Sequence, residues 1–331
     1  MARVTRDEVA RRAGTSPAVV SYVLNDGPRP VAAQTRARVL RAMEELGYQP
    51  NLLARALRAQ RTNAVGLIVP DSANPYFSEL AKSVERAAYA RGRVLLLGNA
   101  GYSMEHEHRY LETLANMRVD GLLLAHAELP SGEPAHPPAV DMPLVYLSYP
   151  APTGVAATSV VHDNEGGGYL ATRHLFEHGH RRVACLTGPA GSGPVATRAA
   201  GWRRAVAEAD ADGSPLLRSD FDRYSAYRLA ASRLSGTDRP SALFAATDEL
   251  ALGVLRAAAE LGIAVPDELA VVGFDGIAET GFTLPPLTTV HHPIDALGVV
   301  AVDALFDGAA GRRDVVLPTT LLRRRSCGCS G

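Results

Sequence analysis

The sequence predicts an α/β protein with two doubly wound parallel-sheet lobes, preceded by a small all-α helix-turn-helix headpiece. From residue 64 onward, compact apolar runs that end in polar or turn residues alternate with helical patterns. This alternation is typical of parallel sheets covered on both faces. About ten such runs are too many for one sheet, and the alternation pauses in the Pro-rich segment 129–153. The residues before 64 instead hold three short helical patterns.

The first helix of the headpiece is predicted to begin after Thr5 and to end at Gly14. Thr5 and Glu8 have the spacing of a capping box, and glycine is the favoured residue just past a helix end. The apolar positions assign this helix an inward face of Val9, Ala10 and Ala13.

The second and third helices follow by the same reasoning. Ser16 is a good N-cap and Pro17 suits a first turn, so the second helix extends to about Asn25. Its Val20, Val23 and Leu24 share one buried stripe. The third helix spans 33–46, with Gly47 as its C-cap and Val39, Met43 and Leu46 inward. A tight turn between the first two helices completes a helix-turn-helix pattern.

In the remainder of the chain, helical patterns separate the predicted strands. They span 76–91, 104–117, 166–178, 196–209 and 249–261. The late segment 287–306 adds one more strand and helix, which we expect to cross back to the first lobe. Residues 51–60, NLLARALRAQ, have helical character but too few apolar partners to stand alone.

Charge is divided unevenly along the chain, although the net charge of the whole is −1. The first 61 residues hold eleven Arg and five acidic residues, a net charge of +6, so the rest of the chain carries −7. A basic segment ahead of an acidic body indicates a nucleic-acid partner for the first sixty residues only.

The sequence further predicts a cytoplasmic protein without a metal site. Three cysteines are too few for a disulfide framework. Charges are spread through the N-terminal residues, which excludes a signal peptide, and no apolar run approaches the roughly 20 residues of a membrane span. Cys327 and Cys329 supply two thiols where a structural zinc site needs four ligands, so no metal is expected.

Polar residues end several of the predicted strands, and in open parallel sheets ligands bind beyond the carboxyl ends of the strands. Arg198 follows another strand and can offer a bidentate fork to hydroxyls or a carboxylate. Phe77 and Phe221 can supply flat apolar walls. A single Asp after a strand is often only a helix N-cap, which is the first interpretation of Asp71 and Asp248. The polar strand ends are Asp71, Asn99, Asp163, Asn164, Asp248 and Asp275.

Motifs for enzymatic chemistry are weak or missing. The run GPAGSG lacks both the GKS/T ending of a phosphate loop and the spacing of a dinucleotide fingerprint, and no G-x-S-x-G elbow occurs. His174 and His178 lie four residues apart without an H-E-x-x-H pattern, so we expect a solvated helix end there. The chain is predicted to be no enzyme and to need no cofactor.

Several segments, in chain order, match one known family. They read VTRDEVARRAGTSPAVVSYVLND, TRARVLRAMEELGYQPNLLARALR, AVGLIVPDSANPYFSEL, HLFEHGHRRVACLTGP and AATDELALGVLRAAAELGIAVPDELAVVGFD. Together they resemble the lactose repressor/galactose repressor (LacI/GalR) family of bacterial transcription factors. The resemblance implies a homodimer with a DNA-binding headpiece (1–48), a hinge helix and linker (49–61) and a periplasmic-binding-protein-like core (62–331). In the core it implies a first lobe of about 62–160 plus 292–318 and a second of about 163–290 plus 319–326.

The resemblance also implies that the outer face of the second helix reads the major groove of a palindromic operator. Val19 stands where family members usually carry Thr, and Tyr22 where many carry Arg or His; tyrosine cannot read guanine bidentately as arginine does. Leu57 of the hinge is expected to wedge between central base pairs in the minor groove. The expected DNA contacts are Thr5, Ser16, Pro17, Ala18, Val19, Ser21, Tyr22, Asn25, Arg29, Asn51, Ala54 and Leu57.

In the core, Arg198 and Asp275 match the arginine and aspartate with which the family binds sugars. Thr247 stands where a sugar-binding Asn often occurs, and Ser192 replaces an arginine of the purine-binding branch. A sugar is therefore the first choice of effector, and a nucleoside or other metabolite is the alternative. The expected effector contacts are Asn74, Phe77, Asp163, Ser192, Arg198, Phe221, Thr247, Asp275 and His292.

Two other classes of protein compete with an effector-controlled repressor. A solute-binding protein would share the core fold, but the basic headpiece and the missing signal peptide count against it. A sugar-modifying enzyme would need an acid/base pair in the cleft. Asp163 and Asp275 could form such a pair, but no motif supports it.

Overall fold

The computed structural model describes residues 4–25, 29–49, 62–125, 142–152, 154–155, 157–189, 193–211, 213–307 and 313–330. The chain divides into two compact units, Met1–Thr62 and Asn63–Gly331. Among the expected site residues, Asn51, Ala54, Leu57 and Ser192 lie outside the described residues.

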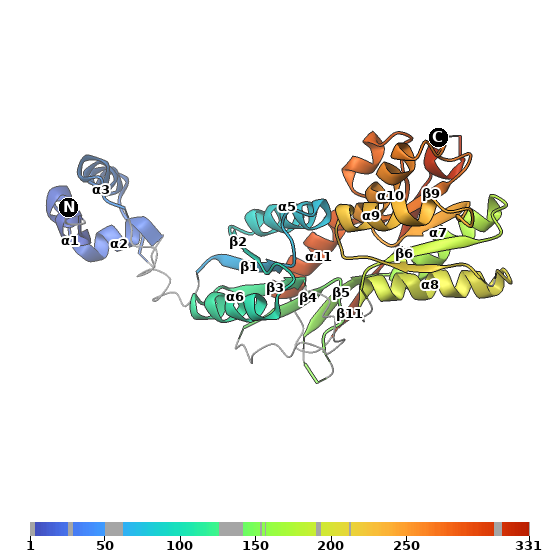
Figure 1. Ribbon diagram of the computed structural model, residues 1–331. Coiled ribbons are helices and arrows are strands. Elements are labelled where there is room, and N and C mark those ends of the chain that lie inside the picture. The colour runs from blue at the N-terminus through green and yellow to red at the C-terminus, as the bar shows by residue number, and fades with distance from the viewer. Residues whose placement is uncertain are drawn as a thin grey trace. The chain divides into compact units, whose positions relative to one another are not determined.

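The first unit contains the three predicted helices, α1 (Arg6–Ala13), α2 (Pro17–Asn25) and α3 (Ala33–Leu46) (Figure 1). The predicted capping box is confirmed: Glu8 N donates to Thr5 Oγ1 at 3.3 Å, and Thr5 N donates to Glu8 Oε2 at 2.7 Å. Gly14 and Gly47 end α1 and α3 in the left-handed conformation, with φ of 62° and 63°. That conformation strains any residue with a Cβ, which explains glycine at both ends.

One apolar core holds the headpiece together. The stripes predicted for α1 and α2 are confirmed, with Leu24 at the edge. The stripe of α3 is centred on Val39 and Ala42, while Met43 and Leu46 pack half-buried beside them. The buried residues are Val9, Ala10, Ala13, Val20, Val23, Val39 and Ala42. Burial of these faces leaves the opposite side of α2 to solvent.

The second unit contains two lobes, each built on a six-stranded sheet of described residues. The first sheet has the order β2-β1-β3-β4-β5-β11, with all neighbours parallel. Helices α5 (Pro75–Ala90) and α11 (Ile294–Phe306) cover one face, and α6 (Met104–Asn116) covers the other (Figure 1). The strands are β1 (Ala64–Val69), β2 (Val94–Asn99), β3 (Gly121–Ala125), β4 (Leu144–Leu147), β5 (Thr158–His162) and β11 (Asp314–Leu317).

The second sheet repeats this topology in the order β7-β6-β8-β9-β10-β12, and only β12 is antiparallel to its neighbour. Helices α7 (Asn164–Glu177) and α8 (Pro194–Glu208) cover one face; α9 (Arg223–Leu234) and α10 (Asp248–Glu260) cover the other. Short 3₁₀ helices η1 (Ala278–Phe282) and η2 (Arg325–Cys327) follow β9 and β12. The strands are β6 (Val183–Thr187), β7 (Leu216–Arg218), β8 (Ala242–Ala245), β9 (Ala270–Asp275), β10 (Thr288–His291) and β12 (Thr320–Leu322).

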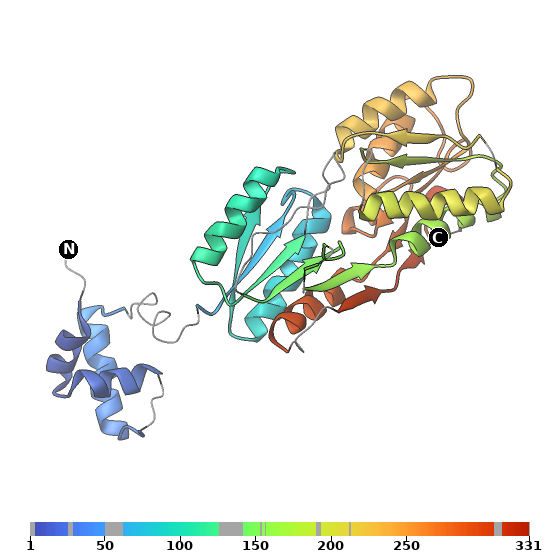
Figure 2. The ribbon, with the colours of Figure 1, turned by 90° about the horizontal axis from the view of Figure 1, so that it is seen from below.

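The described chain passes between the lobes three times: after β5, after β10, and between β11 and β12. In Figure 2 the green β5 and the red β11 lie side by side where the chain leaves the first lobe. The strand and helix predicted for 287–306 are β10, in the second sheet, and α11, packed on the first. These crossings place the carboxyl ends of both sheets around a common region.

Some elements were not predicted. They are the strands β7, β11 and β12 and the helix α9. The three strands have only three or four residues and lie at or next to sheet edges, so they carry no long apolar run. In α9 the buried face consists of Ala226, Ala230 and Leu234, which is too small an apolar stripe to stand out. None of the helices in the described part of the chain has the length and apolarity that a membrane span requires.

The expectation of a solvated histidine pair at the end of α7 is wrong for His174. Its side chain is only 4% exposed, and its Nε2 lies 3.3 Å from Cys327 Sγ. Burial lowers the pKa of His174 to about 4, so its imidazole is neutral. His178, one turn later, is exposed.

Helices α7 and α8 approach each other closely because glycines lie at their crossing. A Cβ added at Gly201 would lie 2.0 Å from Glu165 O and 2.6 Å from Tyr169 N, and one added at Gly168 would lie 2.1 Å from Arg198 O. Backbone cannot yield as a flexible side chain does, so both positions require glycine. The crossing fixes the part of α8 that carries Arg198.

We predict that Gly201→Ala lowers the free energy of unfolding by about 2 kcal/mol, in the range of overpacked cores. Urea denaturation measures the change. Gly281→Ala is the matched control, because a Cβ there meets nothing within 4 Å. Equal stability of the two variants would contradict the close crossing.

Candidate functional site

The outer face of α2 is the first candidate surface. Ser16, Pro17 and Ala18 are exposed at its N-terminal end, and Ser21 and Tyr22 are half-buried one turn later. Ser16 caps the helix by accepting a hydrogen bond from Val19 N at 3.3 Å. In a helix-turn-helix, the N-terminal residues of the second helix contact base edges. No residue of α2 is acidic, so this face does not repel phosphates.

The other described DNA-binding candidates surround this face in the sequence. Thr5 and Arg29 are exposed, and Val19 is half-buried. Thr5 is already engaged in the capping box, since its hydroxyl donates to Glu8 Oε2 at 2.8 Å. Asn25 is the last residue of α2.

The second candidate site is a cavity of about 630 Å³ between the two lobes of the core. Aromatic and apolar side chains with a few polar groups line it, as is typical of small-molecule sites. The predicted effector residues that line it are Asn74, Phe77, Arg198, Phe221, Thr247 and Asp275. Other lining residues were not predicted from the sequence, among them Tyr76, Tyr102, Ser148, Tyr149 and Val195.

Strand ends and helix starts bring these residues to the cavity. Asn74 and Thr247 are the N-caps of α5 and α10, and accept hydrogen bonds from Tyr76 N at 3.0 Å and Leu250 N at 3.2 Å. Asp275 is the last residue of β9. The cavity therefore occupies the position at the carboxyl ends of the strands where doubly wound sheets bind ligands.

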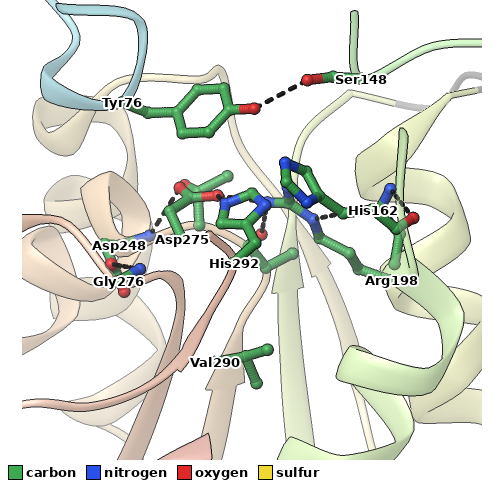
Figure 3. Close-up of polar contacts among 12 residues, drawn as sticks. Tyr76, Ser148, His162, Arg198, Asp248, Asp275, Gly276, Val290 and His292 are labelled. Carbon is green, nitrogen blue, oxygen red and sulfur yellow. Dashed lines mark hydrogen bonds and ion pairs between the residues drawn. The ribbon is translucent and has the colours of Figure 1, made fainter. Parts of the chain in front are cut away.

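A buried ion pair forms one wall of the cavity (Figure 3). Arg198 Nη1 lies 2.9 Å from Asp275 Oδ1, and the two side chains are 5% and 6% exposed. Nη1 also donates to Ala246 O at 2.8 Å, and Nε donates to Asn164 Oδ1 at 2.9 Å. The guanidinium lies 3.9 Å from the centre of the Phe274 ring. With these partners the buried charge is compensated.

Backbone strain accompanies this pair. Asp275 has φ of 124°, a conformation that residues other than glycine rarely adopt. The next residue, Gly276, has φ of 79°, and a Cβ there would lie 2.5 Å from His291 Nδ1. Strain of about 1 to 3 kcal/mol at one residue persists only where the surroundings impose it, and such residues cluster at functional sites.

Asp248 stabilises the strained turn through hydrogen bonds from the turn's backbone. Its Oδ2 accepts hydrogen bonds from Gly276 N at 2.7 Å and Ile277 N at 3.0 Å, and its Oδ1 accepts one from Thr289 Oγ1 at 2.7 Å. Burial, and then the nearby charge of Asp275, raise the pKa of Asp248 well above its ordinary value. Burial also raises the pKa of Asp275, against the opposing effect of Arg198.

Aromatic rings form further walls. Tyr102 and Phe221 both line the cavity and stack on each other, with ring centroids 6.0 Å apart and planes 12° apart. Tyr76 Oη lies 2.8 Å from Ser148 Oγ, and burial raises the pKa of Tyr76 to about 12. These rings offer flat apolar surfaces beside the polar groups.

Two histidines sit at the crossings between lobes. His162 ends β5 and His292 follows β10, and their ring centroids are 4.0 Å apart (Figure 3). His292 Nε2 lies 3.2 Å from Asp275 Oδ1, and its ring stacks on Tyr76 of α5. Burial lowers the pKa of both histidines far below the ordinary value, so both are neutral.

Several expected cleft residues lie elsewhere. Asp163 is exposed and caps α7 by accepting a hydrogen bond from Gly166 N at 2.9 Å. His292 is fully buried behind Asp275 and does not line the cavity.

Other polar residues at strand ends have local structural roles. Asp71 accepts a hydrogen bond from Ala73 N and Asn99 accepts one from Ser72 N, so both shape the loop before α5. Asp248 is no N-cap, because Thr247 caps α10.

The fold and the cavity define a class of protein: a two-lobed binding core of the periplasmic type with a helix-turn-helix headpiece. Residues 5–51 match the family of bacterial regulatory proteins named after lacI, and residues 172–327 match the periplasmic binding protein-like domain. The HTH-type transcriptional repressor PurR of Erwinia tasmaniensis is 36% identical to the chain over 329 residues, which cover 97% of this chain and 96% of that protein.

Solved structures agree with this assignment. The lac repressor dimer bound to operator and the anti-inducer ONPF superimposes with a TM-score of 0.84 at 26% identity, covering 98% of this chain and 99% of that one. The complex of the regulator CelR with cellobiose has a TM-score of 0.70 at 31% identity, covering 98% and 100%. The chain belongs to the lacI family, and it is a DNA-binding transcriptional regulator with an effector-binding core.

The buried histidines predict how stability depends on pH. In the unfolded chain a histidine titrates near 6.5, whereas native His162 and His292 stay neutral because burial lowers their pKa. Below pH about 6.5 the unfolded state therefore binds protons that the native state does not. As the pH falls further, each histidine lowers the free energy of unfolding by up to about 1.4 kcal/mol per pH unit. Asp248 and Asp275, whose native pKa is raised, contribute the opposite slope above pH about 4.

Because these slopes oppose each other, the test compares variants. We expect the free energy of unfolding to decrease less from pH 7.5 to pH 5.5 in His162→Phe than in the unaltered protein. Urea denaturation measures this decrease. His106→Phe, on the exposed side of α6, controls for the loss of a histidine. A slope for His162→Phe equal to that of the unaltered protein would rule out a neutral buried His162.

Proposed function

We propose that the chain is a homodimeric repressor whose affinity for a palindromic operator is set by a small polar effector, in the first instance a sugar, bound between the lobes. The observation that carries this proposal is a hydrogen-bond donor of Arg198 that lies at the cavity and is unpaired within the described part of the chain. Arg198 Nε and Nη1 are engaged, while Nη2 has no hydrogen-bond partner among the described residues and belongs to a side chain that lines the cavity. A donor that opens onto the cavity from a largely buried side chain takes a ligand or water as its partner.

A sugar fits the chemistry of this wall. Arg198 donates hydrogen bonds, and Asp275 accepts them, so together they suit a ligand with neighbouring hydroxyl groups. Phe77 and Phe221 can pack against the apolar face of a pyranose ring. The cellobiose complex of CelR supports a sugar for this chain as well. A nucleoside is the second candidate, because the stacked Tyr102 and Phe221 offer a flat wall to a planar base.

An enzymatic role has no support in the cavity. A sugar-modifying enzyme would need Asp163 and Asp275 as acid and base, but Asp163 caps α7 on the surface and does not line the cavity. A repressor acts on chromosomal DNA, so we propose that the protein works in the cytoplasm.

Communication between cavity and headpiece is proposed through the hinge segment 49–61. An effector that binds one arrangement of the lobes more tightly shifts the population toward it. We propose that this shift decides whether the hinge helices of the dimer form and whether Leu57 enters the minor groove.

Tyr22, on the outer face of α2, should help to set the half-site sequence that is read in the major groove of DNA. Tyr22→Arg should change the preferred half-site, because arginine reads guanine bidentately and tyrosine cannot. Selection of bound sequences from random DNA measures the preference. Tyr224→Arg adds the same charge to an exposed position on α9 and should keep the original motif. Identical motifs from all three proteins would show that Tyr22 reads no base.

A further prediction concerns the cavity. A thermal-shift screen of mono- and disaccharides and nucleosides identifies the effector. A ligand at 100 times its Kd raises the free energy of unfolding by about 2.7 kcal/mol. Arg198→Ala should then weaken effector binding by about 2 to 4 kcal/mol, because it leaves effector hydroxyls without a donor and Asp275 without its cationic partner. Isothermal titration calorimetry measures this loss.

Arg204→Ala is the matched control, since Arg204 lies on the same helix but pairs at the surface with Glu165. It should bind the effector normally. Effector binding by Arg198→Ala as tight as by Arg204→Ala would place the ligand elsewhere, and a nucleoside hit in place of a sugar would select the second candidate.

A further inference from the structure

Two residue pairs from distant parts of the sequence meet at the C-terminal end of α7. His174 lies in the last turn of this helix and His178 is its C-cap, while Cys327 and Cys329 flank Gly328 just after β12. The four possible ligand atoms, two imidazole nitrogens and two thiol sulfurs, all lie within 4.8 Å of one another. Each pair alone is a weak motif; together they form a set of two nitrogens and two sulfurs.

Three of the six distances within this set are close to those of a tetrahedron around one ion, and the other three are no longer than 4.8 Å. His174 Nε2 lies 3.3 Å from Cys327 Sγ and 3.5 Å from Cys329 Sγ, and His178 Nε2 lies 3.4 Å from Cys329 Sγ. Zinc bonds of about 2.3 Å to sulfur and 2.0 to 2.1 Å to nitrogen place tetrahedral S and N ligands about 3.5 Å apart.

Hydrogen bonds alone account less well for this arrangement. A neutral imidazole nitrogen either donates or accepts one bond along its lone-pair direction, and a thiol has one proton. Here both sulfurs approach His174 Nε2, and Cys329 Sγ approaches both imidazoles. A single ion at the centre satisfies all of these contacts at once.

The fold holds the cysteine side of the cluster in place independently of any ion. Ser326 Oγ donates to Val271 O at 2.6 Å and accepts from Thr288 N at 2.8 Å, which ties the tail to β9 and β10. Thr288 Oγ1 donates to Arg324 O at 2.9 Å and lies 3.0 Å from Cys327 Sγ, so the same hydroxyl holds both the tail backbone and this sulfur. Gly328 has φ of 93°, and a Cβ there would lie 3.5 Å from His178 Nδ1. This glycine lets the chain turn so that both thiols face α7.

We propose that His174, His178, Cys327 and Cys329 bind one Zn²⁺ per chain and thereby fasten the tail 325–329 to α7. Two sulfur and two nitrogen ligands in a tetrahedron select zinc among the common divalent ions. On binding, each thiol releases its proton to solvent and coordinates as a thiolate. Two thiolates and two neutral imidazoles leave the complex without net charge, which suits a site with buried His174 and Cys327. Exposed His178 and half-buried Cys329 give the ion access from solvent.

The ion would tie together both ends of the second lobe's chain. Helix α7 is the first element of that lobe and the tail is the last, so the site closes it. At its other end α7 supplies Asn164, which holds Arg198 at the cavity. The site is separate from the effector cavity and does not depend on the proposed function.

The test measures zinc in the full-length protein, purified without a histidine tag or chelator, by inductively coupled plasma mass spectrometry. We expect one zinc per chain in the unaltered protein and almost none in His178→Ala and Cys329→Ser. These two positions lie on the accessible side of the cluster, so both variants should fold, which far-UV circular dichroism checks. The matched controls, His180→Ala and Cys185→Ala, remove a neighbouring histidine and the remaining cysteine and should keep the zinc.

Cobalt gives an independent readout. Co²⁺ added to the zinc-free protein should produce the intense visible bands of tetrahedral coordination and a thiolate charge-transfer band, and both should be missing in Cys329→Ser. A chelator should lower the melting temperature of the unaltered protein by about 3 °C or more and leave that of Cys329→Ser unchanged.

Three results would overturn the proposal. The first is an unaltered protein that holds no zinc and gives no tetrahedral cobalt spectrum. The second is an unchanged zinc content in both His178→Ala and Cys329→Ser. The third is a Cys327–Cys329 disulfide found by peptide mapping of freshly purified protein. A melting temperature insensitive to chelator would contradict the fastening of the tail.

Discussion

The buried pair of Arg198 and Asp275 is the interaction on which the rest of the core depends. Taking two charges out of water costs several kcal/mol per ion, and the pair persists only because other groups compensate it. Asn164 from α7, the carbonyl of Ala246 after β8 and the ring of Phe274 on β9 all contact the guanidinium. One side chain thus joins three elements of the second lobe at the carboxyl ends of its strands.

This constraint explains features around the cavity that would otherwise be unfavourable. Asp275 adopts a strained backbone conformation, and Asp248 is buried beneath it to hold the following turn. The glycines at the crossing of α7 and α8 allow the backbone of Arg198 to approach α7. His292 carries the network to the crossing between lobes, where it stacks on Tyr76 from the first lobe. A ligand that engages Arg198 and Asp275 is therefore coupled, through direct contacts, to the segment that joins the lobes.

Much of the fold could be predicted because its signals are local. Capping residues and apolar periodicity identified α1, α2 and α3, and the five core helices whose ranges were predicted begin and end within about two residues of those ranges. Continuous apolar runs identified the central strands, which are buried on both faces. Edge strands such as β7 and β12 escaped detection because they are short and half-exposed, and α9 because alanines supply most of its buried face.

The candidate site was predictable only in part. Arg198, Phe221 and Asp275 were identified from their places after strands and from the family resemblance, and they line the cavity. Tyr76 and Ser148 were missed, because nothing in either local segment indicates that they would meet across 72 positions of sequence. Asp163 was misplaced, since a carboxylate after a strand can turn toward the cleft or cap the next helix, and local sequence does not distinguish the two.

The sequence by itself determined the headpiece, the two parallel-sheet lobes and the family, because periodicity, caps and motifs act over a few residues. Only the tertiary structure decided which polar groups face the cavity and which are buried behind it. Only the tertiary structure brought His174 and His178 to Cys327 and Cys329, about 150 positions away in the chain. The physical reason is that a cluster of this kind depends on how the tail of the chain packs against the first helix of its lobe, and that packing is set by the sheet on which both lie.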